Sequence, residues 1–308
     1  MPTVQVTHLT KAFRTYKKQP GFAGAIKGLF RRTYEQTAAV RDVSFTIELG
    51  ELVGFLGPNG GSARVLGYTP WERADGYRRQ FALLLGQKNQ LWWDLPARES
   101  LELNAKIYGI PDDVLHRTVA EMTELLAVRE KLDVAVRELS LGERMKMELI
   151  ASLLHRPKVL FLDEPTIGLD VSMQATVRDF VARYNERHGA TILLTSHYME
   201  DVQRLCPRVI VIDKGLLVYD GPLDQLVARI RPDKRIVFRF ARPVDRSDLG
   251  SFGTVVRHDT GESVLDVHKD AVNRVVTQVL AQLPVSDLTV ENPPLEEVMS
   301  ELFARHRA

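Results

Sequence analysis

Short apolar runs alternate along the chain with longer periodic stretches, and this alternation predicts the order of strands and helices. An uninterrupted run of apolar or β-branched residues is typical of a buried strand. Helical patterns separate most of these runs, so we expect an α/β fold, with a mostly parallel sheet covered on both faces. The strands predicted for this sheet are residues 52–56, 81–85, 159–162, 191–195 and 209–212.

Two further strands are predicted near the N-terminus, because apolar and polar residues alternate over residues 4–6 and 43–47. Between them, residues 16–36 predict a small basic amphipathic helix. This helix either packs on its own domain or contacts the membrane face or a permease. Its apolar side chains are Phe22, Ile26, Leu29 and Phe30, and its basic ones are Lys27, Arg31 and Arg32.

The remaining patterns predict a helical subdomain and a separate C-terminal domain. Charged, periodic residues indicate the helical subdomain at about 96–155. The character changes near residue 231, so we expect domains at 1–230 and 231–308. The second is a small α+β domain, with strands at 236–240, 254–257 and 264–267 and helices at 271–283 and 295–305.

Composition and charge narrow the function classes. The formal net charge is +1, which gives no reason to expect nucleic acid as a partner. No apolar run reaches the roughly twenty residues of a membrane span, and the N-terminus has no apolar signal core. We therefore expect a cytoplasmic chain. The single cysteine, Cys206, fits a reducing compartment and is expected to be buried and structural rather than catalytic.

The strongest chemical signal is a pair of acids directly after the predicted strand 159–162. Asp163 and Glu164 should lie at the carboxyl edge of a parallel sheet, where ligands bind. Asp163 is placed to hold Mg²⁺, and Glu164 can polarise an attacking water. Taken alone, the pair also fits a strand that simply ends in polar loop residues.

Three other segments support the same chemistry. Ser140 and Gly142 stand at the start of a helical pattern. This helix N-terminus is either an anion-binding site or simply capped by Ser140. The turn Gly168-Leu169-Asp170 follows the two acids. His197 comes at the end of the strand 191–195, where a lone histidine is usually structural but a group of this kind suggests a γ-phosphate sensor.

In this order the segments resemble the ABC ATPase family over roughly residues 3–230. Gly57-Pro58-Asn59-Gly60, followed by Gly61, resembles the opening of the Walker A loop, and Gln87 resembles the Q-loop glutamine. Ser140, Leu141, Gly142 and Glu143 resemble the signature, Asp163 and Glu164 the Walker B pair, Asp170 the D-loop and His197 the switch histidine. The resemblance implies a P-loop NTPase-like fold.

The resemblance also implies cofactors and partners. Two such subunits, in a homodimer or heterodimer, would enclose ATP and Mg²⁺, with Gln87 and His197 sensing the γ-phosphate and Gln87 joining Asp163 at the metal. The adenine would stack on Phe13, with Tyr16 and Tyr34 as alternatives. Closure of the pair would drive a separate membrane permease, which places the chain at the inner face of the membrane. A soluble ABC protein of translation or DNA repair is a third possibility, disfavoured by the single cassette and neutral charge.

The sequence departs from the family at the phosphate loop. A complete Walker A loop has the pattern Gly-x-x-x-x-Gly-Lys-Ser/Thr, but Ser62, Ala63 and Arg64 stand where glycine, lysine and the hydroxyl residue belong. Residues 61–67 resemble the family segment after the Walker A helix, so roughly eighteen residues, including that helix, are missing by comparison with the motif. We therefore expect weak or absent hydrolysis by this chain and exposed apolar surface beside the central strand. Neither Arg64 nor Lys88 is placed on a glycine loop that would aim it at a phosphate.

Other features point to a subgroup and to an alternative role. The basic insert, residues 87–95 and the C-terminal domain resemble bacterial exporters with separate permeases. Trp92 and Trp93 serve either core packing or docking. Glu143 replaces a glutamine and would repel a phosphate if it faced inward, or else it faces solvent. The alternative role is an inactive subunit that docks on a permease and contributes only its signature face to the ATP of a partner.

Overall fold

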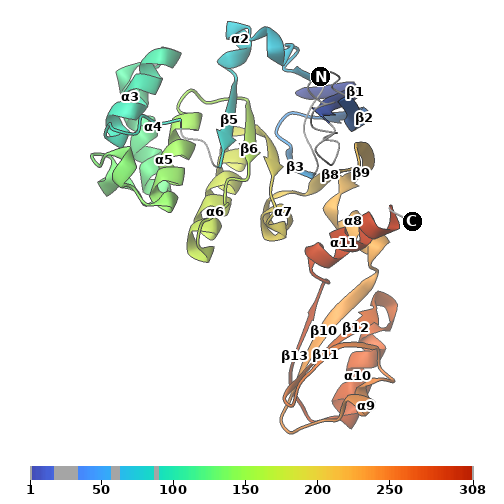
Figure 1. Ribbon diagram of the computed structural model, residues 1–308. Coiled ribbons are helices and arrows are strands. Elements are labelled where there is room, and N and C mark those ends of the chain that lie inside the picture. Colours follow the sequence, from blue (N-terminus) through green and yellow to red (C-terminus); the bar gives the residue numbers. More distant parts are fainter. Residues whose placement is uncertain (1, 17–33, 57–62, 87–89, 307–308) are drawn as a thin grey trace, which may run out of the picture. The chain divides into compact units, whose positions relative to one another are not determined.

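The computed structural model describes residues 2–16, 34–56, 63–86 and 90–306, with backbone only for 11–16, 34–39 and 56. The chain divides into two compact units, Met1–Gly221 and Pro222–Ala308 (Figure 1). The sequence-predicted Walker A segment 57–61, Gln87 and the basic insert 17–33 all fall outside the described residues.

A six-stranded sheet forms the centre of the first unit. Its order is β5-β6-β7-β3-β8-β9, and the neighbours from β5 to β8 are parallel. This confirms the predicted α/β fold, and each of the five predicted strands is present. The strands are β3 (Leu52–Leu56), β5 (Phe81–Leu85), β6 (Val159–Asp163), β7 (Thr191–Thr195), β8 (Arg208–Asp213) and β9 (Leu216–Pro222).

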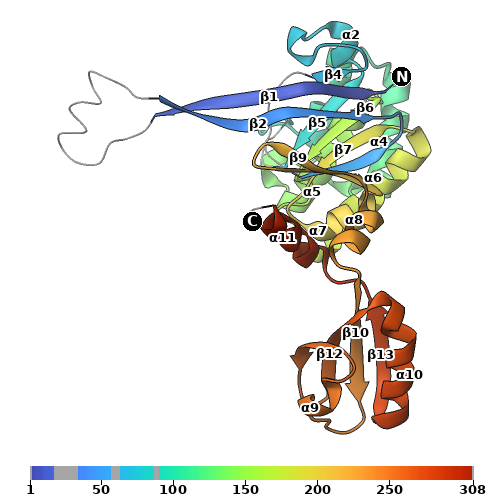
Figure 2. The same cartoon turned by 90° about the vertical axis from the view of Figure 1, so that its right-hand side faces the viewer.

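An antiparallel sheet of order β2-β1-β4 packs over this core, formed by β1 (Val4–Tyr16), β2 (Tyr34–Ile47) and β4 (Ala63–Val65). Figure 2 shows β1 and β2 as a long two-stranded ribbon. Val6 and Phe45 from this sheet join one buried cluster with Val53 and Val159 from the parallel sheet. Tyr16 and residues 34–36, predicted as part of the basic helix, belong to these strands instead.

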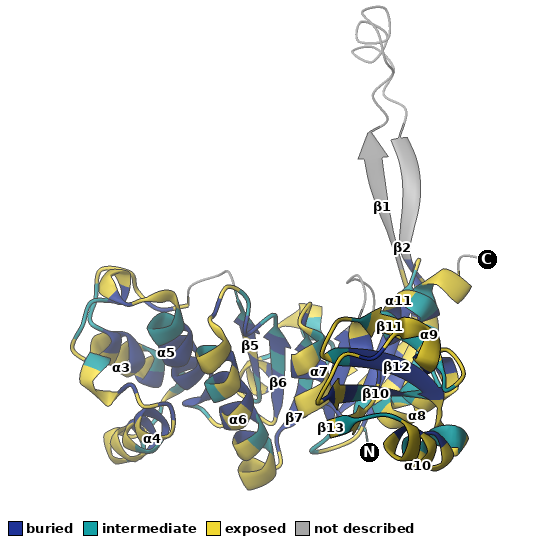
Figure 3. Cartoon of the chain, turned by 90° about the horizontal axis from the view of Figure 1, so that it is seen from below, coloured by how far each residue is buried: buried dark blue, intermediate teal, exposed yellow. Residues whose placement is uncertain are grey.

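Helices and the antiparallel sheet together cover the parallel sheet. The outer faces of the helices are exposed while the strands are mostly buried (Figure 3). The helical subdomain contains most of them, and α6 and α7 follow β6 and β7. The elements are η1 (Pro70–Glu72), α2 (Asp75–Arg78), α3 (Ala97–Tyr108), α4 (Asp112–Leu125), η2 (Arg129–Lys131), η3 (Val136–Glu138), α5 (Leu141–Leu153), α6 (Val171–His188) and α7 (Met199–Leu205).

The second unit is a small α+β domain. Its antiparallel sheet has the order β11-β12-β10-β13, and Ile236, Phe238 and Leu265 pack against Val279 of α10. The edge strand β13 was not predicted, because most of its residues are exposed and carry no apolar run. The elements are α8 (Leu223–Ile230), β10 (Asp233–Phe240), α9 (Arg246–Leu249), β11 (Thr254–His258), β12 (Glu262–His268), η4 (Lys269–Ala271), α10 (Val272–Gln282), β13 (Val285–Glu291) and α11 (Leu295–Arg305).

Candidate functional site

The carboxyl ends of β6 and β7 bring the predicted acids and the histidine together. Asp163 and Thr195 are paired in the sheet register, and the Thr195 hydroxyl donates a hydrogen bond to the Asp163 carboxylate. One residue further on, Glu164 Oε1 lies 2.8 Å from His197 Nε2. The His197 side chain is 85% exposed and that of Glu164 is 25% exposed, so both groups are open to a ligand.

The backbone holds Glu164 in an unusual conformation. Its φ is +52°, in the left-handed region that residues with side chains rarely adopt. Its N–H donates to the Thr195 carbonyl at 3.0 Å, and its carbonyl accepts from the Ile167 N–H at 3.2 Å. One hydrogen bond from the N–H of Glu164 and one to its carbonyl thus maintain a strained backbone at the acid that is expected to polarise water.

Gly86 permits this arrangement, and the sequence analysis did not identify it. Gly86 follows β5, and its N–H donates to the Asp163 carbonyl at 2.9 Å. A Cβ atom at this position would lie 2.3 Å from the Glu164 carbonyl oxygen. Only glycine therefore fits here without moving Glu164.

The signature segment forms the N-terminus of α5, and Ser140 is its N-cap. The Ser140 N–H and Oγ donate to Glu143 Oε2 at 2.9 and 2.8 Å, while the Glu143 N–H donates back to Ser140 Oγ at 3.3 Å. Lys131 Nζ lies 3.0 Å from Glu143 Oε1. These hydrogen bonds, first that from the Ser140 backbone, lower the pKa of Glu143 to about 2. Glu143 thus turns back onto the helix N-terminus as a capping box.

The signature and the D-loop lie next to each other within the chain. Asp170 is the N-cap of α6, and its Oδ1 accepts from the Met173 N–H at 2.9 Å. A Cβ at Gly142 would lie 3.1 Å from Met173 Cγ, and one at Gly168 would lie 3.1 Å from Leu141 Cδ2. The segments predicted to face a partner's nucleotide therefore support one another locally.

The phosphate-loop residues Gly57, Pro58, Asn59, Gly60 and Gly61, together with Gln87 and Lys88, lie outside the described residues. Phe13 is part of β1, but its side chain is not described. The strand β3 ends at Leu56 and β4 begins at Ala63, so six residues connect them. Arg64 is exposed, and its neighbours Ala63 and Val65 point to the opposite face of β4, towards the parallel sheet.

An apolar hollow of about 440 Å³ lies between the two sheets of the first unit. Phe55, Leu83, Phe161 and Leu193 line it from the parallel sheet, and Asp163 and Thr195 lie at its edge; Val4, Val6, Phe45 and Val65 are among the residues that line it from the antiparallel sheet. Leu83 is 41% exposed although it belongs to a strand of the parallel sheet. This leucine lies on the edge strand β5, whereas Phe55 of β3 is buried, so the exposed apolar surface expected beside the central strand stays a prediction.

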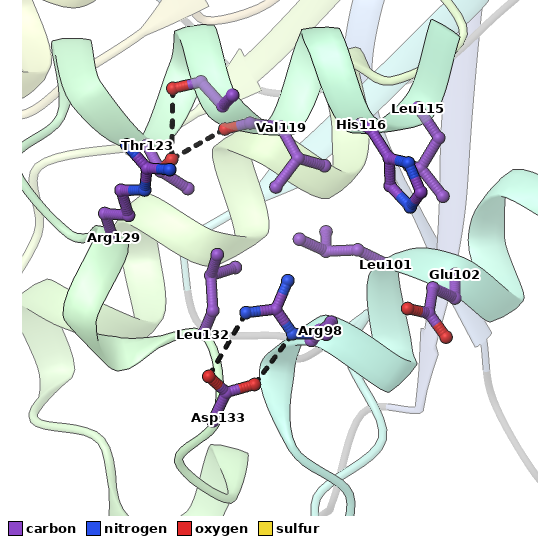
Figure 4. Close-up of a pocket in the computed structure, with 11 residues that line it drawn as sticks. Arg98, Leu101, Glu102, Leu115, His116, Val119, Thr123, Arg129, Leu132 and Asp133 are labelled. Carbon is purple, nitrogen blue, oxygen red and sulfur yellow. Dashed lines mark hydrogen bonds and ion pairs between the residues drawn. The ribbon is translucent and has the colours of Figure 1, made fainter. Parts of the chain in front are cut away.

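A second cavity, of about 520 Å³, lies between α3 and α4, away from the strand ends (Figure 4). Arg98 donates to both carboxylate oxygens of Asp133, at 2.7 and 3.1 Å, and the Thr123 hydroxyl donates to carbonyls of its own helix. Because this cavity lies within the helical subdomain and none of the strand-end acids lines it, we assign it no part in the nucleotide site.

The structure places three side chains for which the sequence left two interpretations: those of Trp92, Trp93 and Cys206. Trp92 and Trp93 are 40% and 45% exposed, and the Arg144 guanidinium lies 5.3 Å from the Trp93 ring centre, so core packing is wrong for this pair. Cys206 is buried, and burial raises the pKa of its thiol, which confirms the structural interpretation.

The acids of the site suit Mg²⁺ only together with a phosphate. Among the described residues, no group of three or more His, Cys, Asp or Glu side chains could hold a metal ion. Asp163 offers one carboxylate at the sheet edge, and Mg²⁺ on nucleotides is bound through one or two carboxylates plus phosphate oxygens and water. The residues therefore fit a metal that arrives with ATP. Within the described part of the chain, no helix is long and apolar enough to span a membrane.

Two family models match the chain. The model of the C-terminal domain of EvrA-like ABC transporters matches residues 232–291. A second model, an AAA domain of the AbiEii toxin type (type IV toxin–antitoxin system), matches residues 79–200. The first model covers the sheet of the second unit, and the second covers the segment from β5 to the start of α7.

Relatives extend the likeness over most of the chain. The linearmycin resistance ATP-binding protein LnrL of Bacillus subtilis is 28% identical over 302 residues, covering 89% of this chain and 96% of LnrL. The ABC transporter ATP-binding protein NatA of the same organism is 32% identical over 206 residues, covering 61% and 83%. The Nod factor export ATP-binding protein I of Ralstonia nicotianae is 31% identical over 220 residues, covering 66% and 68%.

Solved structures agree on the fold. An ATP-binding subunit of an ABC transporter superposes with a TM-score of 0.58 at 21% identity, covering 74% of this chain and 92% of that chain. A dimeric ATP-binding cassette, MJ0796 in a post-hydrolysis state with ADP and Pi, gives 0.57 at 18% identity, covering 71% and 98%. The fold and the strand-end acids define an ABC-type ATPase subunit. The chain belongs to the family of ABC transporter ATP-binding subunits, of the type that serves exporters.

Proposed function

We propose that this chain works beside a membrane permease as one of two paired ATP-binding subunits, and that hydrolysis at its own phosphate loop is weak or absent. The pair would couple ATP hydrolysis to export at the inner face of the membrane. The chain would dock on the permease and present its signature face to the nucleotide held by its partner. A partner subunit with a complete phosphate loop, rather than a second copy, would then supply most of the turnover.

One observation carries the second half of this proposal. The strand β3 enters the phosphate loop, yet only six residues separate its last residue, Leu56, from Ala63 of β4. The Walker A pattern needs eight residues for the loop alone, and a helix must follow it. This connection has no place for the lysine that reaches the β- and γ-phosphates, for the hydroxyl that binds Mg²⁺, or for the helix N-terminus that faces the phosphates.

The lengths of the aligned stretches support a deletion. The stretch aligned with NatA is 206 residues long but takes up 61% of this 308-residue chain, about 188 residues, which leaves this chain about 18 residues short. The stretch aligned with the doxorubicin resistance protein DrrA of Mycobacterium tuberculosis is 219 residues long and takes up 65%, about 200 residues, a shortfall of about 19. Both values match the length of a loop end and a helix.

The apolar hollow between the two sheets is also consistent with a missing helix. It lies beside β3 and β4, the two strands that the short connection joins. Its lining is apolar except near Asp163 and Thr195. Helices that cover parallel sheets bury such surfaces.

The retained residues favour a half-site role over complete loss of function. Glu164 and His197 still lie 2.8 Å apart at the strand ends, and Asp163 still offers a carboxylate for Mg²⁺. Ser140 still caps α5, and although its own N–H and hydroxyl donate to Glu143, the other N–H groups of this helix N-terminus suit a phosphate. When bound, Mg²⁺ would neutralise charge that develops on the phosphates.

Calorimetric titration of the purified chain with Mg-ATP tests this proposal. We expect no binding in the micromolar range, from a sample whose circular dichroism shows that it is folded. Turnover should equal that of Glu164→Gln within error. Tight binding, together with turnover that Glu164→Gln abolishes, would overturn the proposal and restore the chain as an independent ATPase.

Relatives carry names that refer to linearmycin and doxorubicin resistance and to Nod factor export. We propose export of a small molecule on that basis, and we expect the permease to choose it.

A further inference from the structure

Asp201 lies at the centre of a buried hydrogen-bond cluster to which the family resemblance assigns no role. Its side chain is 0% exposed. Its Oδ2 accepts from the Thr166 hydroxyl and, at 2.7 Å, from the Ser196 hydroxyl, and its Oδ1 accepts from Arg178 Nη1 at 2.9 Å. Three donors from three parts of the chain thus form hydrogen bonds with one buried carboxylate. Without such partners, burying the charge would cost several kcal/mol.

The first branch of this cluster reaches the loop that carries Glu164. Thr166 follows Glu164 by two residues and is 1% exposed. Its carbonyl accepts from the Leu169 N–H at 3.2 Å, which closes the turn towards the D-loop. The hydroxyl bond to Asp201 therefore fixes the position where the loop leaves Glu164.

The second branch reaches the turn that carries His197. Ser196 is buried, and its Oγ both donates to Asp201 and accepts from the Tyr198 N–H at 3.0 Å. The residues on each side of His197 are thereby held by one hydroxyl group. The imidazole itself is exposed, so the turn rather than side-chain packing determines where it points.

The helix that carries Asp201, α7, is packed tightly against the parallel sheet. Val202 of α7 and Cys206, the C-cap of this helix, pack against β3 at Gly54, where a Cβ atom would lie 3.2 Å from Val202 Cγ1 and 3.3 Å from Cys206 Sγ. Arg178 connects the same carboxylate to α6, which lies beside α7 (Figure 1). The position of Asp201 is therefore fixed by the packing of α7 and by the bond to α6, and not only by the two loops that it contacts.

We propose that Asp201 is a positioning residue that couples the Glu164 loop to the His197 turn and sets the 2.8 Å separation of the two side chains. Its relevance to nucleotide chemistry rests on the proposed function. The coupling itself is a property of the chain without nucleotide, because each bond in it joins residues of the described structure.

Hydrogen exchange of single backbone amides on the nucleotide-free full chain tests the coupling. The substitution Thr166→Val removes the first branch and keeps the shape, while Thr166→Ser keeps the hydroxyl. We expect Thr166→Val to speed exchange at the Tyr198 amide roughly fivefold, the scale of one lost hydrogen bond, and Thr166→Ser to leave it unchanged. Thr166 does not bond to Tyr198, so this effect passes either through Asp201 or through the hydrogen bond from the Glu164 N–H to the Thr195 carbonyl, and the double variant below distinguishes the two.

A double variant gives a second, independent criterion. Asp201→Asn alone should speed exchange at both Ile167 and Tyr198, and adding Thr166→Val should change Tyr198 no further, because the connection is already lost. The proposal is overturned if Tyr198 is unaffected by Thr166→Val, if the two changes add, or if the Leu194 amide inside β7 accelerates as much, which indicates general loosening. Binding of Mg-ATP would refute the proposed function and leave these exchange results intact.

Discussion

His197 Nε2 lies 2.8 Å from Glu164 Oε1, although the two residues follow different strands and are 33 positions apart in the chain. The parallel register of β6 and β7 produces this contact, because it places Asp163 opposite Thr195 and brings the two loops out at the same edge. A pair of this kind can orient water only when a phosphate is held beside it.

Restoring the missing segment should therefore restore catalysis. We would insert the segment of NatA that has no counterpart here between Gly60 and Gly61. The insertion should produce Mg-ATP binding and turnover, and Glu164→Gln should then lower turnover by about 10²- to 10⁴-fold, the range for a lost proton-transfer group. The matched control replaces the lysine of the inserted segment with alanine. A folded insertion variant that binds no nucleotide would contradict the explanation.

Replacing Gly86 should disturb Glu164 directly. A Cβ at this position would meet the Glu164 carbonyl at 2.3 Å, so Gly86→Ala must shift the strained loop. We expect a loss of about 1–3 kcal/mol in the free energy of unfolding, typical of overpacking. Gly261→Ala serves as the control, because a Cβ at Gly261 meets nothing within 4 Å and should change stability by less than about 0.5 kcal/mol. Denaturant titration compares the two, and equal effects would be evidence against the close contact.

The hollow predicts opposite outcomes for two adjacent leucines of β5. Leu83 is 41% exposed and lines the hollow, whereas Leu84 is fully buried on the other face. Leu84→Ala should cost about 2–5 kcal/mol, and Leu83→Ala should cost well below about 1.5 kcal/mol. A fluorescent apolar dye should bind the wild-type chain and bind less to Leu83→Ser. If the two alanine variants were equally unstable, Leu83 would have to be covered in solution.

Glu143 should give stability a distinct dependence on pH. Its pKa is lowered to about 2 from a normal value of 4.5, so its contribution is present above pH 4.5 and is lost as the pH falls through about 2. Glu143→Gln removes the charge but keeps an oxygen that can accept from Ser140. The free energy of unfolding of the variant should lie below that of the wild type at pH 7, and the difference should vanish near pH 2. A difference independent of pH would point to side-chain shape rather than charge.

In the second unit, a buried ion network should matter more than an exposed one on the same strand. Arg235 is buried and bonds to Asp266 and Glu297, while Arg239 is mostly exposed and faces Glu262 and Asp287. Arg235→Ala leaves Asp266 buried without this partner and should cost about 3–5 kcal/mol. Arg239→Ala should cost less than about 1 kcal/mol. Amide exchange in β10 measures both, and similar values would contradict the burial argument.

Much of the fold could be predicted because its signals are local. The strands of the parallel sheet are short apolar runs, and β5 and β7 have the predicted ends. Helix α11 also begins and ends where its periodicity indicated. The strand β13 escaped prediction because most of its side chains are exposed, so burial leaves no apolar pattern in its sequence.

The family could be predicted from the sequence alone and is confirmed, because the motifs depend on residue type and spacing along the chain. The roles of the motif residues and the shortened phosphate loop stay predictions of the same kind. Tertiary structure alone decided which of these residues meet. Glu143 could have faced a phosphate or solvent, but it caps its own helix and pairs with Lys131. The hydrogen bond between Asp201 and Thr166 could not be predicted from the sequence, because the two residues are 35 positions apart. Contacts of that kind depend on how helices and strands pack, and spacing along one segment does not encode them.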